Sequence, residues 1–338
     1  MTPPIRQLGR CSLSLTTLGA GTYVMGGGGW AGSWGFQDDA SSIAALRRAF
    51  DLGINWIDTA PAYGLGHAEE IVRQALMGTS LAERPFLFTK CGRRWSGADR
   101  TAPLTGNLRP ASIREECEAS LRRLGAERID LYQIHWPDLT TGTRVEDSWG
   151  EMSRLVEEGK VRFAGVCNFD IALLERCEQI RHVDSLQPPF SLITRGAAAD
   201  VIPWCAAHGT GVITHSSMKS GLLTDSFSAD RIEAMEQGDW RRRNPDFQEP
   251  ALSRNVALRD ALRPVAQRHR ATVSDVALGW VLAWPGVTGA IVGSRSPAQV
   301  EGWIGAATVE LTPTDFDEIT DAIETSGAGS GPTRPAVE

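Results

Sequence analysis

The residues best suited to chemistry lie between Asn55 and Gly64, where the chain reads Asn-Trp-Ile-Asp-Thr-Ala-Pro-Ala-Tyr-Gly. A run of strand type ends at Asp58, and Tyr63 follows across a turn that contains a proline. An acid at a strand end and a phenol on the following loop can project into one pocket. Such a pair suits the handling of a proton at a carbonyl group.

Two further polar side chains end strand-like runs, namely Lys90 and His135. The pKa of a free tyrosine is about 10, so a phenol is a poor proton donor near neutrality. A lysine ammonium nearby favours the phenolate and lowers that pKa. An aspartate paired with the lysine keeps the lysine charged and aims it, and a histidine can orient a substrate oxygen. Together the four would protonate a carbonyl oxygen as a hydride reaches its carbon.

Each of these residues also has a simpler structural explanation. An aspartate at a strand end most often caps the following turn. A lysine that ends a buried strand usually pairs with a carboxylate, and a single histidine is more often a hydrogen-bonded core residue than a catalyst. The occurrence of all four types in successive strand order favours a catalytic cluster over four unrelated coincidences.

Short apolar runs that alternate with helical patterns must position this cluster. Several runs are continuously apolar, which is typical of a parallel sheet buried on both faces. The expected strands are 18–23, 55–59, 86–90, 129–135, 163–168, 185–187, 212–215 and 288–293. The expected helices are 41–52, 68–76, 109–125, 146–158, 172–180, 200–208 and 298–306.

This alternation predicts an α/β protein with a single (β/α)8 TIM barrel over residues 1–324. In such a barrel the active site lies at the C-terminal ends of the strands. A doubly wound sheet would also fit the alternation, but no G-x-G-x-x-G fingerprint opens a helix after a strand. The four glycines at 26–29 are not that fingerprint.

Three segments fall outside the alternation. Residues 8–16 are expected to form an N-terminal β-hairpin that caps the barrel floor. Residues 224–255 are too long for a plain connection, so they are expected to carry function or a helix of their own. A C-terminal loop and helix extension completes the barrel, and residues 325–338, rich in glycine and serine, are expected to be disordered.

Composition narrows the function classes. A net charge of −7 argues against a nucleic-acid-binding surface. The six cysteines include no C-x-x-C pair and are expected to be reduced core thiols. No apolar leader or long apolar run is present, which predicts a soluble cytoplasmic protein without membrane association. The histidines show no metal-ligand spacing, so no metal is expected.

The chain resembles the aldo-keto reductase superfamily, in the bacterial branch near the inositol-operon and general-stress reductases. The matching segments occur in order along nearly the whole chain: 57–64, 68–70, 89–90, 131–138, 165–169, 187–192 and 291–295. The Asp–Tyr–Lys–His tetrad of that family matches Asp58, Tyr63, Lys90 and His135.

The resemblance implies NADP(H), bound in extended form over the barrel top without a Rossmann motif. The nicotinamide carboxamide would meet Asn168 and Gln187, and Phe190 would replace a stacking tyrosine with its face-on contact kept. The other matched positions are Thr22 and Tyr23 at the end of strand one, Ser216, Met218 and Gly221 for the pyrophosphate, and Gly293, Ser294, Arg295 and Gln299 for the 2′-phosphate.

Two departures from the family pattern concern the cofactor. The usual Tyr-Ser-Pro-Leu reads His-Ser-Ser-Met at 215–218, which loses a proline and makes Lys219 a candidate phosphate donor. The Glu-Asn pair that usually contacts adenine reads Gly302-Trp303. The adenine would then be stacked or lie in a more open site, and the sequence does not indicate how strictly NADPH is preferred over NADH.

Four tryptophans, Trp30, Trp34, Trp95 and Trp136, are expected on loops or strand ends that face the pocket. An aromatic wall suits apolar carbonyl compounds and also sugars, and the simpler alternative is that these side chains cover the barrel rim. The sequence indicates neither the substrate nor an oligomeric state.

The leading hypothesis is an NADPH-dependent oxidoreductase that reduces an aldehyde or ketone, with Tyr63 as proton donor. The partner would be a small carbonyl or alcohol compound. One alternative is an NADP-dependent alcohol or sugar dehydrogenase that works in the oxidative direction. Another is a non-catalytic, cofactor-sensing regulatory subunit, against which the intact tetrad argues, His135 above all.

Overall fold

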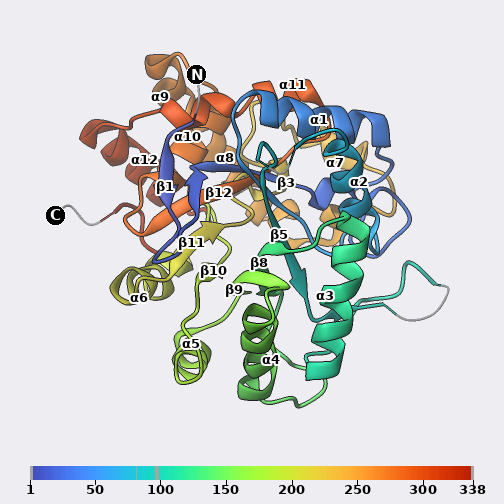
Figure 1. Ribbon diagram of the computed structural model, residues 1–338. Helices are drawn as coiled ribbons and strands as arrows, with labels where there is room; N and C mark the ends of the chain where they lie inside the picture. The colour runs from blue at the N-terminus through green and yellow to red at the C-terminus, as the bar shows by residue number, and fades with distance from the viewer. Residues whose placement is uncertain (1–2, 81, 96–98, 336–338) are drawn as a thin grey trace.

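Eight parallel strands close into a barrel in a computed structural model that describes residues 3–80, 82–95 and 99–335 (Figure 1). The strands neighbour one another in chain order, and the last pairs with the first. They are β3 (Leu18–Gly21), β4 (Trp56–Asp58), β5 (Phe86–Cys91), β8 (Ile129–Ile134), β9 (Val161–Cys167), β10 (Ser185–Gln187), β11 (Gly211–Thr214) and β12 (Val287–Gly293). Each of the eight expected strands overlaps one of these, so the predicted (β/α)8 barrel is confirmed.

Helices surround the barrel on its outside (Figure 1). Those that overlap an expected helix are α1 (Asp39–Asp51), α2 (His67–Ala75), α3 (Pro110–Leu124), α4 (Val145–Glu157), α5 (Ile171–Glu178), α6 (Val201–His208) and α11 (Pro297–Glu301). The expected helix 298–306 is interrupted after α11 and continues as the 3-10 helix η6 (Ile304–Thr308). Four of the other 3-10 helices are η1 (Tyr23–Gly26), η2 (Gly196–Ala198), η3 (Lys219–Gly221) and η4 (Trp240–Arg243).

Further helices lie beyond residue 224, where the sequence pattern predicts the bounds of only one helix, 298–306. They are α7 (Asp230–Glu233), η5 (Pro245–Phe247), α8 (Ala251–Ala261), α9 (Arg263–His269), α10 (Val273–Leu282) and α12 (Pro313–Ser326). Every residue of α10 is buried, so it lacks the polar face that marks an amphipathic helix. Capping boxes begin α10, at Thr272 and Asp275, and α12, at Thr312 and Asp315. This Thr-x-x-Asp spacing is the signal that could have located both.

The N-terminal hairpin closes the barrel floor, as expected. Strand β1 (Ile5–Gln7) pairs with β2 (Ser14–Thr16), so the pairing begins a few residues earlier than predicted. Leu8 and Leu13 of the connecting turn are fully buried against Trp56 and Phe88 inside the barrel. The floor is therefore apolar and sealed, and polar groups gather at the opposite end.

The segment from Thr325, expected to be disordered, is instead held against the barrel as far as the last glycines. Ser330 accepts a backbone hydrogen bond from Arg195 and donates one to Ile193, and Ala328 is buried. Gly329 has φ +61, and a Cβ there would overlap the Ile193 carbonyl. The glycines of this segment allow two backbones to pack closely and do not make the segment flexible. Residues 336–338 lie outside the described residues.

All six cysteines are buried and free of disulfide bonds. In the described ranges, no helix is long and apolar enough to cross a membrane. Among the residues that the structure describes, no three histidine, cysteine or acidic side chains come together in a group that could hold a metal ion.

A buried carboxyl group, Glu116 of α3, fixes the turn that follows β5. Its Oε2 accepts from the Gly92 amide at 2.9 Å, and its Oε1 accepts from the Ser112 hydroxyl at 3.0 Å. Burial raises the pKa of Glu116 to about 7. The two hydrogen bonds hold the backbone that carries β6 (Arg93–Arg94), which pairs with β7 (Thr105–Gly106).

This pKa predicts a stability effect for Glu116→Gln. In the unfolded chain the pKa of this carboxyl is ~4.3, and in the folded protein it is about 7. The neutral carboxyl therefore stabilises the folded protein fully below the unfolded pKa, and this stabilisation is lost as pH rises through the folded pKa. Glutamine can accept from the Gly92 amide through its oxygen and donate to the Ser112 hydroxyl through its NH2 group, and it does not ionise. We expect free energies of unfolding close to the parent at pH 4.5, and about 1–3 kcal/mol above it at pH 8. Urea denaturation measures both.

The matched control is Glu115→Gln at the exposed neighbouring position, which should give the same difference from the parent at both pH values. If the free energy of unfolding of Glu116→Gln at pH 8 equals that of the parent, the ionised carboxyl does not destabilise the folded protein.

Candidate active site

Four polar side chains meet at the carboxyl end of the barrel. Lys90 of β5 is fully buried, and its Nζ donates to Asp58 Oδ2 at 2.6 Å and to Tyr63 Oη at 3.1 Å. A third hydrogen bond, at 2.9 Å, goes to the Thr59 carbonyl oxygen. The lysine therefore bridges the acid that ends β4 and the phenol on the following loop, as the sequence predicted.

Burial and charge act in opposite directions on Lys90. Burial disfavours the ammonium form, but the charges of Asp58 and Tyr63 outweigh it and raise the pKa of Lys90 above its usual value. The lysine thus stays protonated at neutral pH and presents a fixed positive charge to the phenol.

The pKa of Tyr63 differs from the simple expectation. Burial of the phenol raises it to about 12, although the charge of Lys90 acts to lower it. The expectation of a net lowering omitted desolvation, which is the larger effect in this closed pocket. Tyr63 is therefore a neutral phenol near pH 7 and has a proton to give.

His135 follows β8 and faces Tyr63, with ring centroids 5.7 Å apart in an edge-to-face arrangement. Burial lowers the pKa of His135 well below its usual value, and the charges of Lys90, His215 and Arg93 act in the same direction. A neutral imidazole has one N–H donor for a substrate oxygen. Asn168 holds the backbone of His135, because its Nδ2 donates to the His135 carbonyl oxygen at 3.0 Å.

The tetrad opens into a cavity of about 920 Å³ that extends to the end of β12. Ten of the predicted cofactor residues line it: Thr22, Tyr23, Asn168, Gln187, Ser216, Met218, Gly221, Gly293, Arg295 and Gln299. Gln187 also supports the tetrad, because its Nε2 donates to Asp58 Oδ1 at 2.9 Å. The other three predicted cofactor residues do not line the cavity.

Phe190 is one of the three predicted cofactor residues that do not line the cavity. It is fully buried and stacks on Trp280 at 5.4 Å between ring centroids, so its ring belongs to the core. The ring of His215 does line the cavity, and its Nε2 lies 3.0 Å from Asn168 Oδ1. In the sequence, His215 stands out only as a departure from the family pattern. It directly follows β11, so the strand-end rule that predicts Asp58, Lys90 and His135 at the rim could have found it as well.

Lys219 and Ser294 are the other two predicted cofactor residues that do not line the cavity. Lys219 Nζ pairs with Asp246 at 2.9 Å and donates to Thr194, so in this structure its ammonium is engaged with protein groups outside the cavity lining. Ser294 is buried and accepts from the Trp303 indole N–H at 2.6 Å. That indole is itself almost fully buried, so only a small part of it reaches the cavity.

Strained backbone surrounds the same cavity. Asn168, Ser216 and Ser220 have φ values of 61, 58 and 53°, in the left-handed region that non-glycine residues seldom adopt. Such residues cost free energy and cluster at functional sites. Successive backbone N–H groups in turns of this kind form concave sites for anions.

Three of the four predicted tryptophans, Trp30, Trp34 and Trp136, line the cavity, and Trp95 does not. Trp30 packs edge-to-face on Tyr23 with centroids 5.5 Å apart. The guanidinium of Arg241 lies 4.1 Å from the Trp34 ring centroid, a cation–π contact. The aromatic wall is therefore built by the loop after β3 together with Trp136 after β8, and Arg241 of the segment after β11 braces it.

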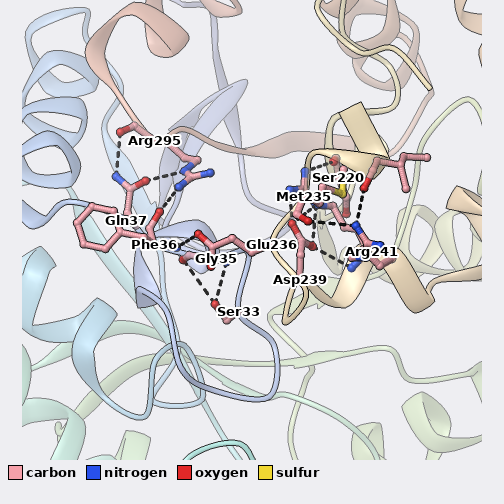
Figure 2. A network of polar contacts seen from close by, with 12 residues as sticks. Ser33, Gly35, Phe36, Gln37, Ser220, Met235, Glu236, Asp239, Arg241 and Arg295 are labelled. Carbon is pink, nitrogen blue, oxygen red and sulfur yellow. Dashed lines mark hydrogen bonds and ion pairs between the residues drawn. The ribbon is translucent and has the colours of Figure 1, made fainter. Parts of the chain in front are cut away.

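Figure 2 shows how these loops and the end of β12 are joined. Glu236 accepts from the Phe36 amide at 3.0 Å, and Arg295 donates to the Phe36 carbonyl and to Gln37 Oε1. On the other side Arg241 pairs with buried Asp239 and donates to the Ser220 carbonyl at 3.4 Å. The long segment 224–255 thus carries the short helices α7, η4 and η5 and closes one rim of the cavity.

Comparison with known proteins identifies the family of this barrel. The model of the aldo/keto reductase family matches residues 22–324. Aldo-keto reductase YhdN of Bacillus subtilis (strain 168) is 32% identical over 313 residues, which cover 92% of this chain and 91% of that protein. The NADH-specific methylglyoxal reductase of Escherichia coli (strain K12) is 31% identical over 328 residues, covering 94% and 98%.

Solved structures agree in fold. The glycerol dehydrogenase AKR11B4 from Gluconobacter oxydans superposes with a TM-score of 0.84 at 33% identity, covering 99% of this chain and 98% of that one. The aldo-keto reductase AKR11C1 from Bacillus halodurans, in its holo form, gives 0.76 at 23% identity, covering 95% and 96%. The match of the family model over most of the chain, together with relatives above 30% identity, shows that this chain belongs to the aldo-keto reductase family.

Proposed function

We propose that this protein is an NADPH-dependent reductase that converts an aldehyde or ketone to the alcohol, with Tyr63 as proton donor. The observation that carries the proposal is the Lys90 bridge, 2.6 Å from Asp58 and 3.1 Å from Tyr63, beside a neutral histidine. The methylglyoxal reductase from E. coli is a relative whose name describes carbonyl reduction.

The protein side chains have distinct tasks in this reaction. The bound cofactor supplies the hydride. The His135 N–H holds the carbonyl oxygen near Tyr63, and the Tyr63 O–H bond breaks as the proton moves to that oxygen. The Lys90 ammonium stabilises the phenolate that remains, and Asp58 keeps Lys90 charged and in place.

The residues present fit a nicotinamide dinucleotide. Polar groups line the cavity from the tetrad, past the strained backbone at Ser216 and Ser220, to Arg295 and Gln299 beyond β12. An arginine fork suits a phosphate group. Since one relative is named as NADH-specific, the choice between NADPH and NADH is the part of the proposal that most needs a direct test.

Arg295→Met provides that test. If Arg295 binds the 2′-phosphate, the loss of a charge-assisted contact should weaken NADPH binding by about 1.5–3 kcal/mol, which is roughly 10- to 100-fold in Kd. NADH lacks this phosphate, so its Kd should change much less. Quenching of tryptophan fluorescence measures both constants.

Arg48→Met is the control, because Arg48 pairs with Glu301 on the outer surface near the same strand end. It should leave both Kd values as in the parent. Equal weakening of NADPH and NADH by Arg295→Met would instead assign Arg295 to support of the 36–37 loop, which its hydrogen bonds also reach.

The oxidative direction is a second candidate, favoured by the relative that is named a glycerol dehydrogenase. A dehydrogenase needs Tyr63 as a phenolate base, whereas a reductase needs the phenol. With a pKa of about 12, the phenol predominates at neutral pH and is lost only as pH rises toward that value. We therefore expect reduction to fade and oxidation to rise in strongly alkaline solution.

The decisive experiment is NADPH oxidation with a panel of aldehydes, α-dicarbonyls, keto-sugars and keto-steroids, with the reverse reaction measured on the matching alcohols. Turnover of at least one carbonyl compound at neutral pH supports the proposal. Tight cofactor binding without turnover of any compound in either direction would favour the cofactor-sensing regulatory subunit.

A further inference from the structure

One cation in the active-site cavity is not used by the mechanism. Arg93 of β6 follows Lys90 by three residues and lines the cavity together with Tyr63 and His135. Its side chain is half-buried, and burial lowers the pKa of its guanidinium. Pro103, Leu104 and Trp136 line the same cavity, so part of the cavity lining is apolar.

Arg93 has no partner among the described residues. No carboxylate in residues 3–80, 82–95 and 99–335 lies within 4.0 Å of its nitrogens, and its side chain donates no hydrogen bond to any of them. The other arginines of the cavity are all engaged. Arg231 donates to Ser226, Arg241 pairs with Asp239, and Arg295 donates to Phe36 and Gln37.

The adjacent residue shows that the strand itself does not require this arrangement. Arg94 points to the other side of the same two-residue strand, where its Nη1 lies 3.4 Å from Glu115 Oε2 and 3.4 Å from Ser112 Oγ. One arginine is therefore partnered on the outer surface, and its neighbour is turned into the cavity without a partner.

A half-buried charge without a partner is unfavourable for the folded protein. Burial is the main cause that lowers the pKa of His135, and the positive charge of Arg93 contributes in the same direction, so the guanidinium lies within electrostatic reach of the tetrad. Low polarity around a cation strengthens its attraction for an anion, and the guanidinium fork binds carboxylate and phosphate groups bidentately.

We propose that Arg93 binds an oxyanion carried by the substrate, so that the preferred substrate is a carbonyl compound bearing a carboxylate or phosphate group. This inference rests on the proposed reductase function. The anion would lie against Arg93 while the carbonyl oxygen lies between Tyr63 and His135. The cofactor phosphates belong to the far end of the cavity, where Arg295 follows β12, so Arg93 is a residue for the substrate.

Matched substrate pairs test the inference. Succinic semialdehyde is compared with butanal for a carboxylate, and glyceraldehyde 3-phosphate with glyceraldehyde for a phosphate. The quantity measured is the ratio of kcat/KM between the charged and the neutral member of each pair. In the parent this ratio should exceed one for at least one pair, and the pair with the larger ratio identifies the class of anion.

Arg93→Met should lower that ratio by about 10- to 100-fold, since it removes a charge-assisted contact made only by the charged substrate. Arg94→Met should leave the ratio as in the parent. A second measurement does not depend on a variant: butanoate should inhibit the parent competitively against butanal.

The outcomes separate this inference from the proposed function. Turnover of neutral aldehydes with no preference for their charged partners, and no inhibition by butanoate, would overturn the role of Arg93 alone. An equal loss on both members of each pair in Arg93→Met would also overturn it and leave Arg93 as a structural residue. No turnover of any carbonyl compound would overturn the proposed reductase function itself.

Discussion

Tyr63→Phe is expected to lower the turnover of a good aldehyde substrate by about 10²- to 10⁴-fold while NADPH still binds as in the parent. The substitution removes only the hydroxyl that would give the proton. Lys90 keeps its hydrogen bonds to Asp58 and Thr59, at 2.6 and 2.9 Å, so the pocket should remain folded. Steady-state kinetics and fluorescence titration of the cofactor measure the two effects separately.

Tyr132→Phe is the matched control for the loss of a buried tyrosine hydroxyl. Tyr132 lies on β8 outside the cavity, and its hydroxyl donates to the Ile113 carbonyl oxygen at 3.3 Å. This variant should keep its turnover even if it loses some stability. If Tyr63→Phe reduced the substrate at the parent rate, another group would have to supply the proton.

Lys90→Met is expected to lower the free energy of unfolding by about 3–5 kcal/mol, because it leaves a buried carboxylate without its cation. Asp58 is 3% exposed, and Lys90 Nζ is its ion-pair partner at 2.6 Å. Activity should be lost as well, since nothing then stabilises the Tyr63 phenolate. Urea denaturation of the parent and the variant gives the stability difference.

The double variant Lys90→Met/Asp58→Asn distinguishes a buried ion pair from a packing defect. Asparagine removes the uncompensated charge and can keep one hydrogen bond from Gln187, so much of the lost stability should return while activity does not. A double variant as unstable as Lys90→Met would mean that the lysine stem, and not the ion pair, holds this part of the core.

The barrel and the tetrad could be predicted from the sequence because both follow from local patterns. Continuous apolar runs mark strands buried on both faces, and the residue that ends such a run must lie at the barrel rim. Asp58, Lys90 and His135 each follow this rule, and Tyr63 is close to Asp58 along the chain. The helix α10 escaped prediction because a fully buried helix has no polar face to mark it.

The pKa of Tyr63 depended on the tertiary structure. The sequence placed a lysine beside the phenol and therefore predicted a lower pKa, but how far the pocket is closed to water depends on loops distant in the chain. Burial in the assembled pocket outweighs the lysine and raises the pKa of Tyr63 to about 12. Desolvation is a property of the whole enclosure, so no single motif encodes it.

The sequence alone therefore determined the barrel, its rim and the four residues at the reaction centre. Only the tertiary structure decided that His215 and not Phe190 faces the cavity, that Lys219 is engaged with Asp246, and that Arg93 but not Arg94 points inward. The physical reason is the range of the forces involved. Strand ends are set by local hydrophobic periodicity, whereas the direction of a loop side chain is set by contacts with residues far away in the chain.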